Sequence, residues 1–277
     1  MPSITGFVDD TDQLAHFALL ETIQTFANAN GWETLRYADT GVDNHELILK
    51  GSGYSGAEEI FIAFRTYQNP GADWYNICCY SLTGYVPSSP VTAQPGVVFS
   101  AVPCHNQRID YWITLSPQRI AGALKVGTPV YESFYLGKFF PYARPSQYPY
   151  PIVCAGMLNG APETRFSDTA YMMPYYGNRE NLKMRSLEGW ITPHVFPHFL
   201  NTGNINEVRD TFGTYMLLPL EMLTPNANVW GCLEGVFWIS GFDNVVENTL
   251  SLDGKTYVVI QDVYRTGHNN YYALLLD

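Results

Sequence analysis

The sequence predicts a mainly β protein, a β-rich α+β fold of antiparallel sheets in a sandwich-like arrangement with one N-terminal helix. Three observations predict it: short runs of β-forming residues between turn residues, one segment with helical spacing, and a long Pro/Tyr-rich stretch without periodicity. With 277 residues the chain can bury a large core, and its length allows one large β-rich domain or two small ones; we expect a single domain over residues 1–277. Its sub-regions are 1–139 (helix and strand meander), 140–225 (irregular) and 226–277 (C-terminal strands).

The helix is predicted from Thr11 to Asn30. Asp10 and Gln13 have the spacing of a capping box, and Asn30-Gly31 is a typical helix end. Apolar side chains recur near helical spacing at Leu14, Phe17, Leu20, Ile23 and Phe26. This apolar stripe should pack on a sheet.

The strands are predicted from runs of β-branched and aromatic residues. Before residue 140 they are Trp32–Tyr37, Glu46–Lys50, Glu59–Tyr67, Asp73–Gly84, Asp110–Ser116, Arg119–Val126 and Val130–Phe139. After residue 225 they are Gly235–Ser240, Asn248–Leu252, Lys255–Val263 and Tyr271–Asp277. Short turns at residues 116–118 and 127–129 predict antiparallel neighbours, and Asp253-Gly254 predicts a hairpin.

The stretch from Phe140 to about Pro225 is rich in Pro, Tyr and Gly and shows little periodicity. A structureless segment of that length is improbable in a compact domain, so we expect it to be partly ordered by packing on neighbouring subunits. Asn181–Leu187 or Asn204–Arg209 could form a helical turn.

Gly51, Gly53 and Gly56 match the G-x-G-x-x-G pattern of dinucleotide-binding sites. Such a site requires a helix directly after the glycines, whose N-terminus holds the pyrophosphate. The residues after Gly56 alternate as a strand, so we predict a hairpin loop and no bound cofactor.

Metal binding is also not predicted. His194 and His198 have the spacing of a zinc-binding helix, but Pro193 flanks them and Pro197 interrupts them. Two loop histidines near prolines fit this segment better, and Cys104-His105 is most simply an incidental pair.

Catalytic residues are not predicted either, and we expect no enzyme activity. The chain has no G-x-S-x-G motif, and no Ser or Cys stands in a known nucleophile pattern. Carboxylates could form a glycosidase pair, which depends on their separation in space. The candidates are Asp110, Glu132, Glu163 and Asp168.

The five cysteines are irregularly spaced, so we expect free, mostly buried thiols and no disulfide framework. No apolar run is long enough to predict insertion into a membrane, and the acidic N-terminus is unlike a signal peptide. A formal net charge of −11 would repel phosphate backbones, which argues against a nucleic-acid partner.

Charged residues make up 15% of the chain, against about 25% in an average domain, whereas aromatic residues reach 15%. Tyr and Trp are enriched at protein interfaces because they combine a large apolar face with a polar tip. An aromatic β-rich core is the alternative explanation. The low charge favours a broad assembly surface.

Two segments carry a resemblance to a known group of proteins. They are Tyr131–Pro151 (YESFYLGKFFPYARPSQYPYP) and Gly231–Phe242 (GCLEGVFWISGF), the latter followed by a run ending at Val263-Tyr264-Arg265. They resemble virion structural proteins of tailed bacteriophages and prophages, usually encoded among tail and baseplate genes. The resemblance extends from about Gly31 to the C-terminus and brings no catalytic residue with it.

This resemblance implies a tail or baseplate subunit that is made in the host cytoplasm and functions in the virion. Its partners would be copies of itself and other virion proteins. The alternative is a receptor- or glycan-binding module of the same particle that contacts a host-surface glycan. The chain's aromatic residues are compatible with either role.

The predicted interface is the strip around the prolines from 141 to 151. Its aromatic residues are Phe139, Phe140, Tyr142, Tyr148 and Tyr150. Neighbouring prolines favour extended backbone, so little entropy is lost when the strip docks. The competing interpretation is a rigid loop that covers the chain's own sheet edge.

Overall fold

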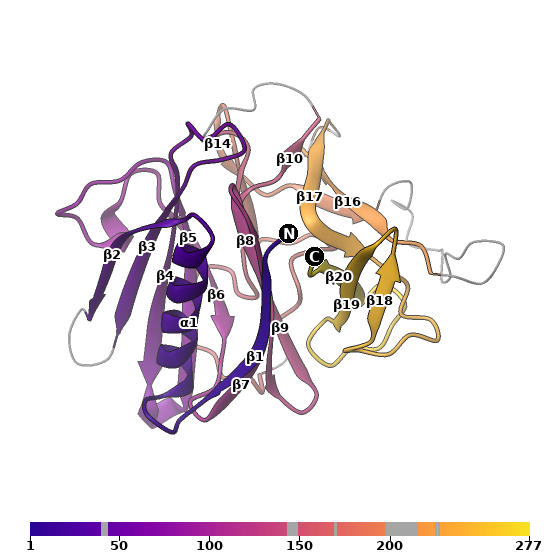
Figure 1. Ribbon diagram of the computed structural model, residues 1–277, viewed down its shortest axis with the longest axis horizontal. Coiled ribbons are helices and arrows are strands. Elements are labelled where there is room, and N and C mark those ends of the chain that lie inside the picture. Colours follow the sequence, from indigo (N-terminus) through magenta and orange to yellow (C-terminus); the bar gives the residue numbers. More distant parts are fainter. Residues whose placement is uncertain (40–43, 143–148, 169–170, 198–214, 225, 227) are drawn as a thin grey trace.

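The computed structural model describes residues 1–39, 44–142, 149–168, 171–197, 215–224, 226 and 228–277. Its strands form three sheets, here called A, B and C, and every pairing between named strands is antiparallel. Figure 1 shows sheet B at one side of the molecule, sheet C at the other and sheet A between them. The mainly β fold class predicted from the sequence is therefore confirmed.

Sheet B is a simple meander. Its strands, in spatial and sequence order, are β2 (Glu33–Asp39), β3 (His45–Gly51), β4 (Ile60–Asn69), β5 (Trp74–Leu82) and β6 (Val98–Pro103). Two short 3₁₀ helices, η1 (Pro70–Ala72) and η2 (Val91–Ala93), lie in its connections. Strand β4 is apolar on both faces because both faces are covered, and its Phe64 ring meets Phe134 of sheet A edge to face at 5.6 Å.

Sheet A packs face to face on sheet B. Its spatial order is β1 (Ser3–Asp9), β7 (Arg108–Ser116), β8 (Arg119–Gly127), β9 (Val130–Lys138), β11 (Ile152–Ala155), β13 (Leu182–Ser186) and β14 (Gly189–Ile191). The predicted turns at residues 116–118 and 127–129 join β7 to β8 and β8 to β9 as antiparallel neighbours. Strands β9 and β11 contact β4, β5 and β6, which gives the expected sandwich.

Sheet C is formed mainly by the C-terminal part of the chain. Its spatial order is β12 (Gly177–Asn178), β15 (His194–Pro197), β16 (Leu218–Leu223), β17 (Val229–Trp238), β20 (Tyr271–Leu275), β19 (Lys255–Gln261) and β18 (Thr249–Leu252), with β10 (Phe140–Pro141) also paired to β17. The hairpin predicted at Asp253-Gly254 joins β18 to β19, and both turn residues have positive φ, as a type I′ turn requires.

The helix α1 (Ala15–Ala29) is shorter than predicted, and the predicted capping box is wrong. The N-cap is Leu14, without a side-chain cap, while the Asp9 carboxylate accepts a hydrogen bond from the Thr11 amide and the Gln13 amide bonds Glu21. Residues before Leu14 are drawn into β1 and its turn instead. The expected packing is confirmed: α1 contacts β1 and β7 of sheet A and β2 to β5 of sheet B.

The region 140–225 contains more strand than predicted. The helical turn predicted at Asn181–Leu187 is wrong because this segment forms β13, where Leu182, Met184 and Ser186 point inward. Asn204–Arg209 lies outside the described residues. Part of the described stretch is ordered by strands of its own chain, such as β11 between β9 and β13.

Strands β10 to β16 lie in the stretch predicted to be irregular, and β1 and β6 also have no counterpart among the predicted elements. The remaining strands agree with prediction within a few residues at their ends, except that β17 begins at Val229, well before the predicted Gly235. One hydrophobic cluster includes buried residues of all three sheets, among them Phe64, Phe134 and Trp238. A second, smaller cluster lies within sheet C.

Candidate functional site

The predicted interface strip is divided by the structure between core and surface. Phe139 is fully buried in the hydrophobic core, whereas Phe140 and Tyr142 are 52% and 50% exposed. Tyr150 is half-buried, and Tyr148 lies outside the described residues. Of the predicted residues, Phe140 and Tyr142 are therefore the ones placed to meet a partner.

Pairing with β17 turns these two side chains outward. Phe140 pairs with Cys232 and Pro141 with Gly231, and the Tyr142 amide donates to the Trp230 carbonyl at 2.9 Å. A side chain at position 231 would collide with the Phe140 carbonyl, so glycine permits this close approach. The Phe140 and Tyr142 rings then lie edge to face, with centroids 6.4 Å apart.

A third exposed aromatic residue comes from sheet B. The loop that contains Gly51, Gly53 and Gly56 joins β3 to β4, which confirms the predicted hairpin loop. The Gly53 amide donates to the Pro117 carbonyl at 2.9 Å and holds the loop on the β7–β8 turn. Tyr54 in this loop is 60% exposed. We call Tyr54, Phe140 and Tyr142 the aromatic face.

A pocket of about 210 Å³ opens beside the aromatic face. Its lining residues are Tyr54, Ser55, Glu58, Gln118, Lys138, Phe140 and Pro141. Lys138 donates to both carboxylate oxygens of Glu58, at 2.8 and 2.9 Å, and its side chain is almost completely buried. The pocket thus has exposed rings at its rim and paired charges in its wall.

Glu234 of β17 joins all three sheets next to this pocket. Its carboxylate accepts hydrogen bonds from Ser116 Oγ at 2.9 Å and Gln118 Nε2 at 3.2 Å, both in the β7–β8 turn of sheet A. It also accepts one from the Tyr54 hydroxyl of the sheet B loop, and Arg119 Nε lies 3.9 Å away. Burial and the Glu234 carboxylate raise the pKa of Tyr54 to about 12.

We call Tyr54, Ser116, Gln118, Arg119 and Glu234 the open junction, because they fix sheet C to sheets A and B beside an accessible pocket. Ser116, Gln118 and Arg119 are buried and hold the Glu234 carboxylate, which in turn fixes the hydroxyl of the exposed Tyr54. A fixed hydroxyl beside a pocket is suited to binding the polar groups of a partner.

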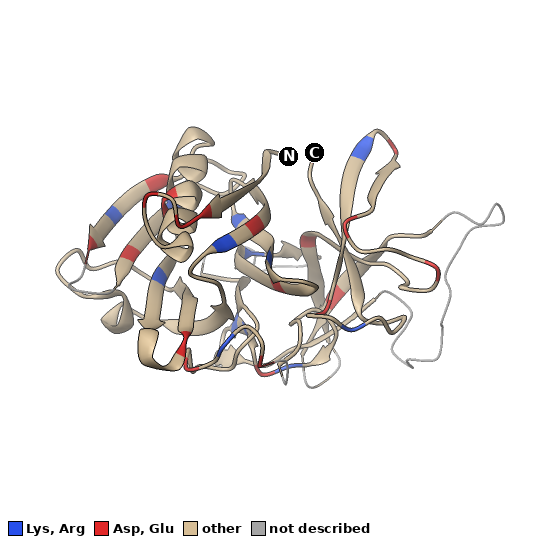
Figure 2. Cartoon of the chain, turned by 90° about the horizontal axis from the view of Figure 1, so that it is seen from below, with Lys and Arg blue, Asp and Glu red and all other residues tan. Residues whose placement is uncertain are grey.

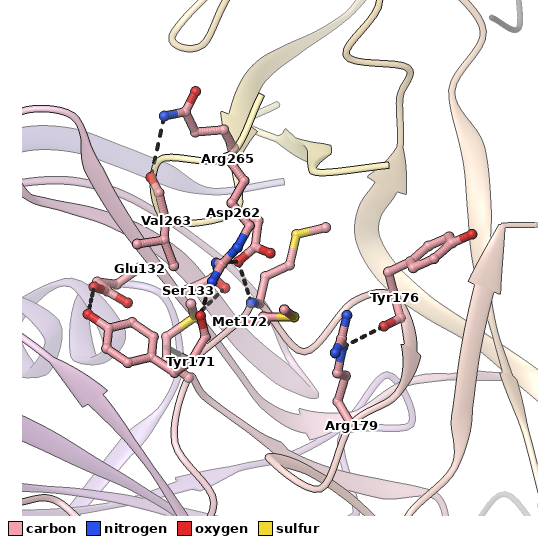
Figure 3. Close-up of polar contacts among 12 residues, drawn as sticks. Glu132, Ser133, Tyr171, Met172, Tyr176, Arg179, Asp262, Val263 and Arg265 are labelled. Carbon is pink, nitrogen blue, oxygen red and sulfur yellow. Dashed lines mark hydrogen bonds and ion pairs between the residues drawn. The ribbon is translucent and has the colours of Figure 1, made fainter. Parts of the chain in front are cut away.

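A second polar cluster joins sheet C to sheet A around two buried carboxylates, Glu132 and Asp262. Glu132 of β9 is fully buried, and its Oε1 accepts a hydrogen bond from the Tyr171 hydroxyl at 2.7 Å. Asp262, which follows β19, accepts from the Met173 amide at 2.6 Å and pairs with Arg265 at 3.4 Å. Figure 3 shows these side chains packed together. We call Glu132, Tyr171, Asp262 and Arg265 the buried junction.

Burial dominates the electrostatics of this junction. It raises the pKa of Glu132 well above its usual value, the nearby Asp262 carboxylate raises it further, and the Tyr171 hydrogen bond opposes both. Burial likewise raises the pKa of Asp262, while its bond from the Met173 amide and the Arg265 charge lower it. Glu132 Oε2 has no hydrogen-bond partner among the described residues.

The four carboxylates considered for glycosidase chemistry lie in different surroundings. Glu132 is buried, Glu163 and Asp168 are exposed, and Asp110 pairs with Arg108 at 2.8 Å. None of them lines the pocket beside the aromatic face. The geometry therefore gives no support to a catalytic pair among these four residues.

The cysteines are free, as predicted, and four of the five are buried. Burial raises the pKa of Cys78 and Cys154 to about 12, so their thiols are weak nucleophiles. His194 lies on β15 and not in a loop, which corrects that prediction, and His198 lies outside the described residues. The described residues hold no group of three or more metal-ligating side chains.

Charged residues are scattered thinly along the chain, as Figure 2 shows. Within the described ranges, no helix has the length and apolar character needed to cross a bilayer. Comparison with known proteins gave no match to a protein-family model, and no curated protein matched the chain.

The functional residues that sequence reasoning missed are those of the open junction and its pocket. Tyr54 and Glu234 are 180 positions apart, and Lys138 and Glu58 are 80 apart. No local pattern connects such residues. The nearest signal was the glycine-rich loop, whose role is to carry Tyr54 over the β7–β8 turn.

Proposed function

We propose that the chain is a structural subunit of a tailed phage or prophage particle, in the tail or baseplate, and that it acts through protein–protein assembly without catalysis. It is made in the host cytoplasm and functions in the virion. Its partners are copies of itself and other virion proteins. The resemblance of residues 131–151 and 231–242 to virion structural proteins supports the assignment to a phage particle.

The observation that carries the assembly role is the aromatic face. Three aromatic side chains are each at least half exposed: Tyr54 and Phe140 line one pocket, and Tyr142 packs edge to face on Phe140. Exposed aromatic clusters next to fixed polar groups are typical of interface centres. The open junction fixes Tyr54 in place, so little order has to be gained on docking.

The proposal is tested by replacing Phe140 and Tyr142 together by Ser and co-expressing the variant with the proteins encoded beside it. Because both rings are exposed, the isolated variant should melt at nearly the same temperature as the wild type. Loss of a buried aromatic anchor costs about 2 kcal/mol or more in an interface, so complex formation should fall at least about thirtyfold. Light scattering after size exclusion measures the complexes.

Phe242→Ser is the matched control, because Phe242 is similarly exposed at 46% but lies outside the aromatic face. It should assemble like the wild type. Equal assembly of the wild type and the Phe140/Tyr142 variant would refute the interface, and a monodisperse wild-type monomer that binds none of these proteins would refute the assembly role itself.

A second candidate function, glycan binding, is favoured by the pocket itself. Aromatic rings at the rim with Glu58, Gln118 and Lys138 in the wall match the mixture of apolar faces and hydroxyl-binding groups that a sugar ring requires. A volume of 210 Å³ lies below the roughly 300–1,000 Å³ of drug-sized sites, so it suits one sugar unit. Binding of host-surface polysaccharide that is lost in Gln118→Ala, with assembly intact, would favour this function.

A further inference from the structure

The strand β1 presents an unpaired edge. It lies at the end of sheet A and, among the described strands, pairs only with β7. The register runs without a shift from Ser3 opposite Thr114 to Asp9 opposite Arg108. In an antiparallel pair, alternate residues direct their backbone groups away from the partner, so β1 offers a row of free donors and acceptors.

Other sheet edges of the molecule carry protection that β1 lacks. The equally long β2 contains Arg36 and has a register shift beside it, and β6 ends in Pro103 and is bridged at Ala101 by Leu158. The edge strands β12, β14 and β18 have two, three and four residues. The β1 sequence SITGFVD contains neither Lys nor Pro. Long edges without such protection readily accept another strand.

A groove of about 610 Å³ separates β1 from the helix α1. Its lining residues are Ile4, Val8, Asp9, Asp12, Gln13, Ala18, Glu21, Thr22, Thr25, Phe26 and Ala29. The helix contributes mainly small side chains, from Ala18 to Ala29, so a backbone could approach it closely. Ile4 and Val8 form an apolar wall on the strand side.

The groove is acidic. Asp9, Asp12 and Glu21 line it, and none of its lining residues is Lys or Arg. The nearby Arg108 pairs with Asp110 at 2.8 Å and lies over the Phe7 ring, which belongs to the opposite face of β1 from Ile4 and Val8. A segment that enters the groove therefore meets negative charge.

We propose that the β1 edge and this groove bind an extended segment of another protein that carries Lys or Arg, by addition of a strand to sheet A. Backbone hydrogen bonds supply the pairing, Ile4 and Val8 receive alternate apolar side chains, and the three carboxylates receive the cations. The identification of the donor as a neighbouring virion protein rests on the proposed function; the binding site does not.

The test uses the full chain and a synthetic seven-residue peptide of alternating Lys and Val, the length of β1. Hydrogen exchange should show slower exchange in residues 3–9 when the peptide is present, and fluorescence anisotropy of the labelled peptide gives its Kd. A peptide with Glu in place of Lys, and a Lys/Val peptide with a central Pro, should bind far more weakly.

Two variants locate the site. Asp12→Asn combined with Glu21→Gln should weaken peptide binding about threefold to tenfold at low salt, whereas the control Glu188→Gln, exposed beyond the far end of sheet A, should not. Thr25→Trp should block binding by filling the groove. If Thr25→Trp fails to fold, the Asp12→Asn/Glu21→Gln variant and its control still show whether the peptide binds in the groove.

Equal binding of the acidic peptide, or no change with the charge variants, would overturn the proposal. Slower exchange of residues 3–9 that depends on protein concentration without peptide would also overturn it and show that a second copy covers the edge. These results are independent of the aromatic face: loss of assembly in the Phe140/Tyr142 variant would leave peptide binding unchanged, and absence of peptide binding would leave that assembly unchanged.

Discussion

Two of the polar junctions that attach sheet C to the rest of the protein use the same kinds of side chain in different surroundings. In each junction a glutamate accepts a hydrogen bond from a tyrosine hydroxyl: Glu132 from Tyr171, and Glu234 from Tyr54. In the buried junction the glutamate is fully enclosed. In the open junction the tyrosine is 60% exposed beside a pocket.

The difference shows how surroundings divide roles between similar residues. Enclosed charges must be paired within the chain, and removing one partner is costly, so the buried junction serves to hold the fold. An exposed polar group loses little when its partner changes, so Tyr54 of the open junction can exchange solvent for another molecule. This is why the open junction, and not the buried carboxylates, is the better candidate for a functional surface.

The largest expected effect is the loss of Asp262. Asp262→Ala removes the carboxylate that pairs with the largely buried Arg265 guanidinium and that accepts from the Met173 amide, and should lower the free energy of unfolding by about 3 kcal/mol. Urea unfolding measures it. Asp110→Ala, which breaks a solvent-exposed pair, is the control and should have a much smaller effect. Equal effects would remove the distinction between enclosed and exposed charges.

The loss of folding stability in acid should come from His16 of α1, which lies outside both junctions. Burial lowers the pKa of His16 to about 3, so the folded state keeps it neutral while the unfolded state binds a proton below about 6.5. Its contribution to stability is therefore complete above pH 6.5 and declines as the pH falls towards 3, by about 2 kcal/mol at pH 5. Thermal unfolding from pH 7 to 5 should show a smaller decline in His16→Leu. An unchanged decline would assign the acid sensitivity to other groups.

The contribution of Glu132 in the buried junction to stability should depend on pH in the opposite sense to that of His16. Because the pKa of Glu132 is raised in the folded state, its favourable contribution is complete below about pH 4.5 and is lost as the pH rises through the raised value. Glu132→Gln keeps an acceptor for Tyr171 without the charge, and should be more stable than the wild type at pH 8 by about 1 kcal/mol. Glu132→Gln that is less stable than the wild type at pH 8 would contradict this account.

The smallest loss of folding stability is expected from a substitution in the open junction. Tyr54→Phe removes the hydrogen bond to Glu234 at a largely exposed side chain and should cost less than about 1 kcal/mol of stability. The same variant should weaken complex formation, since it frees the ring that forms one side of the aromatic face. If Tyr54→Phe destabilises the isolated chain as strongly as Asp262→Ala, the open junction is part of the fold's support and not a surface for a partner.

Much of the sheet framework could be predicted from the sequence because its signals are local. The run of β-forming residues Ile60, Phe61 and Ile62 and the turn at Asp253-Gly254 each specify their own backbone. The strand β1 was missed because Gly6 interrupts a weak alternation of apolar and polar residues. Ile4 and Val8 are the apolar residues that fit this alternation. Its formation depends on β7, which is about 100 residues away.

The Pro/Tyr-rich region shows where local signals fail. Its short strands form because sheets A and C supply partners, as β9 does for β11, and propensity alone does not reveal such partners. The inward alternation of Leu182, Met184 and Ser186 was a usable strand signal. The candidate site was predicted only in part: the exposure of Phe140 and Tyr142 was expected, but the burial of Phe139 and the pocket depend on contacts between distant segments.

Hydroxyl-radical footprinting of the isolated chain and of assembled particles tests the central claim most directly. If the aromatic face is an assembly interface, oxidation of Phe140 and Tyr142 should fall strongly in the particle, because both side chains pass from half exposed to buried. Tyr264, which is 47% exposed elsewhere on the chain, gives the internal reference for exposure. Oxidation of Phe140 and Tyr142 that is as fast in the particle as in the isolated chain would contradict the account.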